Sequence, residues 1–206
     1  MRGRRGPPVD YIIKRLGEIE QYAERVDSQI HILRYDPDLN AYKIRVETIT
    51  TVRGFYDDIV SRHQASFRYV PDRFAKPPDE IGRVLALGEN GQEPVFANEV
   101  IGAEGYFRTW PIEIPAGEVR HVLARYTVYV AVGEPFSSSP MRFSERITAT
   151  LSNSIDEGGL KPLVEIVQGQ QPRKAQLDVE GKILICDEKN ADPGVDVYCC
   201  KIHAPT

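Results

Sequence analysis

Two periodic patterns of apolar residues divide the chain. In the first, apolar or small side chains recur at alternating steps of three and four, at Val9, Ile12, Leu16, Ile19, Ala23, Val26, Ile30 and Leu33. This is the a/d spacing of a coiled coil. It predicts one long N-terminal helix over residues 9–30, which is amphipathic and of the coiled-coil type.

The apolar stripe of this predicted helix is narrow, because the e positions Glu20 and Asp27 are charged. A helix that docks on its own sheet usually carries a wider stripe. A narrow stripe favours self-association, so we expect a homo-oligomer. Docking of the helix across the chain's own sheet is the alternative. The expected oligomer interface consists of Ile12, Leu16, Ile19, Ala23 and Val26.

From about His31 the period changes from 3.5 residues to two, which is typical of strands with one buried face. Residues 41–53 alternate strictly, and one face carries Tyr42, Ile44, Val46, Thr48, Thr50 and Val52. Further strand-like runs continue to the end, the longest at 119–132, and Gly- or Pro-containing turns separate them.

These patterns predict a mainly β fold, an antiparallel β-sandwich, with a barrel as the alternative. The sandwich domain should span residues 31–206 and end in a hairpin over 175–203, turning near Asp192-Pro193-Gly194. Residues 1–8 are basic and rich in Gly and Pro, so we expect a disordered arm there.

Composition restricts the classes of partner. The chain has 206 residues and a formal net charge of -4, which disfavours nucleic acid as a partner. It contains no apolar run of about 18 residues, so no transmembrane segment is predicted. Its three cysteines do not suggest a disulfide framework, because the number is odd and two are adjacent. We therefore expect a reducing, cytoplasmic location.

Basic and aromatic residues are interleaved in two strand-like runs. Such a mixture can stack on an apolar ligand and pair with its charge. We expect a small acidic or phosphorylated ligand, or a partner protein, to bind there. The candidate ligand-binding residues are Arg62, His63, Arg68, Tyr69, Tyr106, Arg108, Trp110 and His121.

Two candidate metal sites are weaker. Cys186, Cys199, Cys200 and His203 carry groups that bind zinc, but the usual Cys-x2-Cys spacing is absent and buried free cysteines are common in cores. Residues 36–47 resemble a calcium-binding EF-hand loop in part, yet Ala41 stands where the sharp turn needs glycine. No cofactor is predicted.

The sequence carries no recognisable catalytic motif. The serines at 137–139 lack the surroundings of a nucleophile elbow. The favoured interpretation is a non-enzymatic, oligomeric binding module with a sensory or regulatory role, which recognises a ligand or partner through the sandwich. One alternative is a small hydrolase-like enzyme with a loop-built site around His63 and His121. A further alternative is a structural protein stabilised by zinc.

Overall fold

The computed structural model describes residues 21–69, 83–89, 98–102, 105–155, 160–168 and 171–204. These residues form thirteen strands in three sheets. Sheet A has the strand order β12-β9-β1-β2-β7-β4. Its strands are β1 (Gln21–Asp36), β2 (Ala41–Gly54), β4 (Arg83–Glu89), β7 (Val119–Ala131), β9 (Ser144–Asn153) and β12 (Lys182–Ala191).

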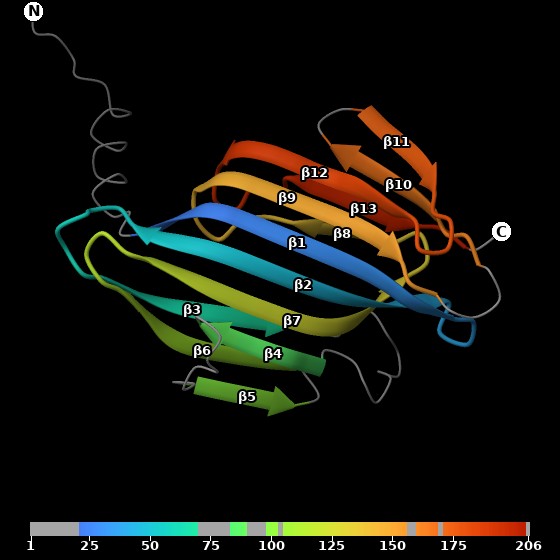
Figure 1. Cartoon of the computed structure of the whole chain (residues 1–206). Helices are drawn as coiled ribbons and strands as arrows, with labels where there is room; N and C mark the ends of the chain where they lie inside the picture. Colours follow the sequence, from blue (N-terminus) through green and yellow to red (C-terminus); the bar gives the residue numbers. More distant parts are fainter. Residues whose placement is uncertain are drawn as a thin grey trace, which may run out of the picture.

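Two smaller sheets complete the fold. Sheet B has the order β3-β6-β5, with β3 (Ser61–Tyr69), β5 (Asn98–Gly102) and β6 (Gly105–Ile114). Sheet C has the order β11-β10-β13-β8, with β8 (Pro135–Ser138), β10 (Leu163–Gln168), β11 (Gln171–Gln176) and β13 (Tyr198–Ile202). Figure 1 shows sheet C behind the β12 side of sheet A and sheet B beyond its β7 side.

One face of sheet A, called here the inner face, packs against both smaller sheets. Against sheet C it forms the main core, to which Ile30, Ile44 and Leu151 of sheet A and Ile166 and Ile202 of sheet C belong. Against sheet B it forms a second core of Val52, Trp110, Ile112 and Ile114. The predicted mainly β fold is therefore confirmed, and the inner face of sheet A packs against two smaller sheets.

Strand β2 shows how the two cores are separated. Its alternating residues lie on the inner face as predicted, with Tyr42 and Ile44 in the main core and Val52 in the second core. Between them the same face presents Thr48 and Thr50, which line a cleft. The alternation of β2 thus continues through both cores. Its two threonines lie where the inner face passes from sheet C to sheet B.

The predicted helix over 9–30 is wrong for residues 21–30, which belong to strand β1. The strand pairs with β2 and β9 through both of its edges. A register shift between Ala23 and Arg25 brings Ala23 and Val26 to the same cleft despite their spacing of three. A β-bulge therefore produces here the three-residue spacing that the sequence pattern attributes to a helix. The remainder of that prediction, residues 9–20, and the predicted arm over 1–8 lie outside the described residues.

The predicted hairpin over 175–203 is also wrong. Strand β12 belongs to sheet A and β13 to sheet C, so the Asp192–Gly194 turn carries the chain between layers. The two strands bury Ile185 and Ile202 in the core that both sheets share. A turn signal marks a change of direction, but it does not specify which strands pair.

Two further details correct the predicted sandwich. Strands β1 and β9 are parallel, so sheet A is mixed and not purely antiparallel. The barrel alternative is wrong, since each described sheet retains two edge strands. The described part of the chain contains no helix long and apolar enough to cross a membrane.

The segment that resembles a calcium loop is a tight turn between β1 and β2. The backbone N–H of Leu39 donates to Asp36 Oδ1 at 3.2 Å, and Asn40 has a φ of 46°. Glu47, at the last position of the resemblance, lies within β2 and pairs with Arg45 and Arg125. The turn residues therefore stabilise a hairpin, as their types favour.

We expect Leu151→Ala to lower the free energy of unfolding by about 2–5 kcal/mol, because it leaves a cavity in the main core. Leu151 is 0% exposed on β9. Leu184→Ala is the matched control, because the same truncation removes a side chain that is 48% exposed. It should cost about 0.5 kcal/mol or less. Urea denaturation measures both, and equal losses would contradict the assignment of the core.

Candidate ligand-binding cleft

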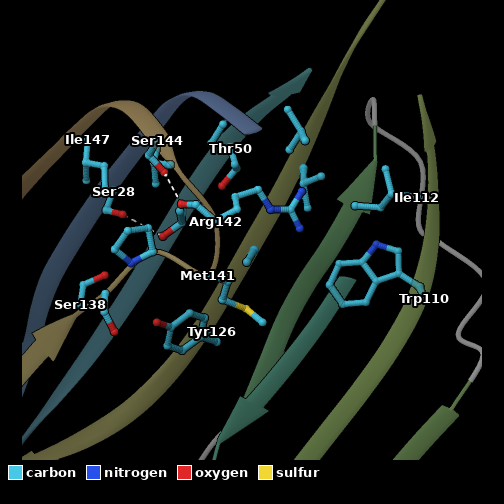
Figure 2. A pocket seen from close by; sticks show the side chains of 18 residues that line it. Ser28, Thr50, Trp110, Ile112, Tyr126, Ser138, Met141, Arg142, Ser144 and Ile147 are labelled. Atoms are coloured by element: carbon cyan, nitrogen blue, oxygen red, sulfur yellow. Dashed lines mark hydrogen bonds between the residues drawn. The ribbon is translucent and has the colours of Figure 1, made fainter. Parts of the chain in front are cut away.

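A cleft of about 310 Å³ opens on the inner face of sheet A, between the two cores. Strands β1, β2 and β7 form its floor, β6 forms one wall, and the segment 138–142 forms the opposite wall. Figure 2 shows these side chains converging on one space. Its volume lies at the low end of the range for small-molecule sites.

The floor combines hydroxyl groups with apolar side chains. Ser28 Oγ and Thr48 Oγ1 lie 3.0 Å apart and hydrogen-bond to each other. Thr50 follows on the same strand face, with Val122 and Ala124 beside it on β7. Hydroxyls that are satisfied locally can line a cavity without a large desolvation cost. The floor can therefore contact an apolar body and still offer hydrogen bonds.

Trp110 and Ile112 form the wall on the β6 side, and their exposed fractions are only 3% and 2%. They project from alternate positions of one strand, so their side chains lie on the same face of sheet B. Figure 2 shows the Trp110 ring at the side of the pocket opposite Ser138 and Ser144. This wall gives the cleft an aromatic surface on which a flat or apolar group can pack.

The opposite wall is held by backbone hydrogen bonds. Ser138 O accepts from the N–H of Val197, Pro140 O from that of Gly194, and Phe143 O from that of Ala23, at 2.8–2.9 Å. Within the segment, Ser144 Oγ donates to Arg142 O at 3.1 Å. The segment between β8 and β9 is thus attached to both sandwich layers, which fixes the backbone of Arg142 before any ligand arrives.

Arg142 is the cationic group of the cleft. Its Nη1 donates to Gln21 Oε1 at 3.0 Å, and Figure 2 shows its guanidinium reaching across the pocket toward Ile112. Burial lowers the pKa of Arg142 from its usual value, yet an arginine keeps its proton at neutral pH. Gln21 is 6% exposed, so its amide is a buried anchor for this side chain.

Tyr126 is the second ionisable group in the lining. Burial raises the pKa of its hydroxyl to about 12, so the ring carries no charge at neutral pH. The described lining contains no Asp, Glu, His, Lys or Cys. Arg142 is therefore the only charged side chain among the lining residues, and the cleft is locally positive in a chain of net charge -4.

Seven of the eight predicted ligand-binding residues lie on two neighbouring strands of sheet B, and the eighth, His121, lies on sheet A. Arg62, His63, Arg68 and Tyr69 lie on β3, and Tyr106, Arg108 and Trp110 lie on its neighbour β6. Of the three whose side chains the structure describes, Arg62, Trp110 and His121, only Trp110 lines the cleft. Arg62 is exposed and donates to Glu113 at 3.0 Å, whereas His121 is on the outer face of sheet A, 3.2 Å from the Thr51 hydroxyl.

The sequence signalled part of this cleft. The two threonines that interrupt the apolar face of β2 could have marked it, since a polar step on a buried face needs a reason. Arg142 gave no such signal, because it lies in a connecting segment without periodicity. Its position depends on pairing between residues that are more than 100 positions apart, such as Ala23 and Ser144.

The candidate zinc ligands are dispersed. Cys186 and Cys200 are buried in the main core, where burial raises their pKa values to about 11 and about 12. His203 Nε2 lies 3.4 Å from Glu165 Oε2. Among the residues that the structure describes, no three metal-ligating side chains converge. Cys186 and Cys200 thus belong to the main core as apolar residues, whereas Cys199 is half-buried on β13.

The expected oligomer interface is divided in the same way. Ile12, Leu16 and Ile19 lie outside the described residues. Ala23 is buried within β1, and Ala23 and Val26 both line the cleft. Their side chains therefore contribute to the inner face of sheet A and not to a helical seam. The oligomer stays a prediction.

We expect the folded protein to react with a thiol reagent mainly at Cys199. The thiolate is the reactive form, and the raised pKa values of Cys186 and Cys200 keep both protonated as well as buried. Labelling with 5,5′-dithiobis(2-nitrobenzoate), followed by mass spectrometry, should modify one cysteine when folded and all three in guanidinium chloride. Cys199→Ser should abolish the first reaction, and rapid labelling of Cys186 in the folded protein would contradict the described core.

No protein-family model matches the sequence, and no curated protein does. Solved structures resemble the fold at low sequence identity. A Legionella pneumophila protein, provisionally named a nutrient binding protein, aligns with a TM-score of 0.50 and 11% identity over 88% of this chain and 66% of its own. An M1 zinc metallopeptidase from Deinococcus radiodurans aligns with a TM-score of 0.44 and 14% identity over 88% of this chain and 42% of its own. The chain thus spans less than two thirds of either structure, and the likeness concerns the fold alone.

Proposed function

We propose that the protein is a binding module that holds a small molecule in the cleft between sheets B and C. The observation that carries this proposal is the cleft itself, about 310 Å³ with an aromatic wall, a floor of hydroxyl and apolar groups, and one inward-facing cation. Concave, mainly apolar sites with a few directed polar groups are typical of small-molecule recognition.

The chemistry of the lining favours binding over catalysis. General acid–base or nucleophilic chemistry at neutral pH needs a group such as His, Cys or a carboxylate at the site. The lining side chains that the structure describes include none of these, and the hydroxyl of Tyr126 has a pKa raised to about 12. His121, one residue of the alternative enzyme site, lies on the outer face of sheet A and is not among the lining residues, so the cleft does not support a catalytic role for it.

The name of the Legionella structure agrees with a binding role but adds no residue to the proposal, since the likeness concerns the fold alone. A sensory or regulatory role, a homo-oligomer and a cytoplasmic location are further proposals. They need measurements on the whole protein and do not bear on the cleft.

We expect 3-phenylpropionamide, a small neutral molecule with an aromatic body, to change the fluorescence of Trp110 when titrated to millimolar concentration. Trp110 is the single tryptophan of the chain and forms a wall of the cleft, so its emission reports on occupancy. Thr50→Phe should abolish the change, because the added ring fills the cleft from its floor.

Thr51→Phe is the matched control, since it places the same ring on the outer face of the same strand. It should leave the titration unchanged. Thr50→Leu, which fills less of the cleft, should weaken binding. It serves as the second variant if Thr50→Phe does not fold. The proposal fails if neither the amide nor its carboxylate analogue, 3-phenylpropionate, alters the fluorescence, or if the change persists in a folded Thr50 variant.

A further inference from the structure

Arg142 is one of two arginines among the described side chains that have no acidic partner. Of the ten arginine side chains that the structure describes, eight pair with a carboxylate, for instance Arg125 with Glu47 at 2.9 Å and Arg146 with Asp187 at 3.0 Å. Arg173 and Arg142 do not. Arg173 is exposed to water, whereas Arg142 is half-buried at an apolar cleft.

Most of the hydrogen-bond donors of Arg142 are also unused within the described part of the structure. A guanidinium has five N–H donors. Among the described residues, one of them is used, to Gln21 Oε1 at 3.0 Å. That acceptor is a neutral amide, so it leaves the positive charge uncompensated. A partly desolvated cation without a counter-ion is costly, and a ligand anion would remove that cost.

We propose that the natural ligand is a monoanion, a carboxylate carried on an apolar body, and that Arg142 binds its carboxylate group. This assignment rests on the proposed function of the cleft. The carboxylate lies against the guanidinium, and the apolar body packs between Trp110 and the β7 side chains Val122 and Ala124. Ser28 and Thr48 lie on the floor for any further polar atom of the ligand.

The charge of the lining selects a monoanion. One guanidinium balances one negative charge, and the described part of the lining supplies no second cation for a phosphate monoester, which carries nearly two. The planar fork of an arginine also matches the two oxygens of a carboxylate. Because no carboxylate lines the cleft, nothing within the described lining repels such a ligand.

The cleft is arranged for this role before binding. The backbone of residues 138–143 is hydrogen-bonded to both layers of the sandwich, and Gln21 holds one end of the guanidinium. A preformed cation loses little freedom when its partner arrives, which favours affinity. The Gln21 amide nitrogen is buried without a hydrogen-bond partner among the described residues, so its contact with Arg142 is the one that orients this amide.

The test compares 3-phenylpropionate with 3-phenylpropionamide, which share one body and differ in charge. Titrations of Trp110 fluorescence, confirmed by calorimetry, should show the carboxylate binding about tenfold to a hundredfold more tightly, as a charge-assisted hydrogen bond implies. Arg142→Gln should remove this preference, lowering the affinity for the carboxylate far more than the affinity for the amide. Arg142→Lys should retain part of it, since the charge remains and the fork is lost.

Arg146→Gln is the matched control, because it neutralises an arginine four residues away that points from the opposite face of sheet A. It should leave the preference intact. Inorganic phosphate and phenyl phosphate test whether the cleft prefers a phosphate to a carboxylate. Both should bind more weakly than 3-phenylpropionate.

The outcomes separate this assignment from the proposed function. If the amide binds in the cleft and the carboxylate binds no more tightly, or if Arg142→Gln keeps the preference, the carboxylate assignment is overturned while the binding cleft stands. Tighter binding of phenyl phosphate overturns it as well. If neither the amide nor the carboxylate alters Trp110 fluorescence, the proposed function itself fails.

Discussion

The apolar inner face of sheet A must be buried, and the fold depends on the two small sheets that bury it. Strands β1, β2 and β7 are 16, 14 and 13 residues long, far longer than the strands of sheet C. Sheet C therefore covers one end of this face and sheet B another. The inner face carries apolar side chains where it is covered, and it carries Thr48 and Thr50 between the two covered regions. The cleft is the part of a long sheet that neither partner reaches.

The arginines on the two faces of sheet A differ in their partners. On the outer face, arginines meet carboxylates in water, and such exposed pairs contribute little to stability. On the inner face, the one arginine at the cleft has only a neutral amide beside it. Because an unbalanced charge near apolar groups lowers stability, its presence indicates a use other than holding the fold.

The sequence predicted the β-rich fold from local patterns, and it failed where distant strands decide. The alternation of β2 and the turn after Asp36 depend on neighbouring residues, so both were predictable. The pairing of β1 with β9 and the separation of β12 from β13 depend on contacts between layers. For the same reason Trp110 was selected for its residue type, whereas Arg142 became a candidate only through its surroundings.

The parallel pairing of β1 with β9 also governs how the chain folds. More than 100 residues separate Ile30 from its partner Leu151, and closing so long a loop is slow. Until β9 arrives, β1 presents one edge of unpaired backbone groups, which can recruit strands of other chains. Since Arg142 lies two residues before the start of β9, the pairing that covers this edge also completes the cleft. A ligand that requires Arg142 would thus bind only molecules in which β1 and β9 are already paired.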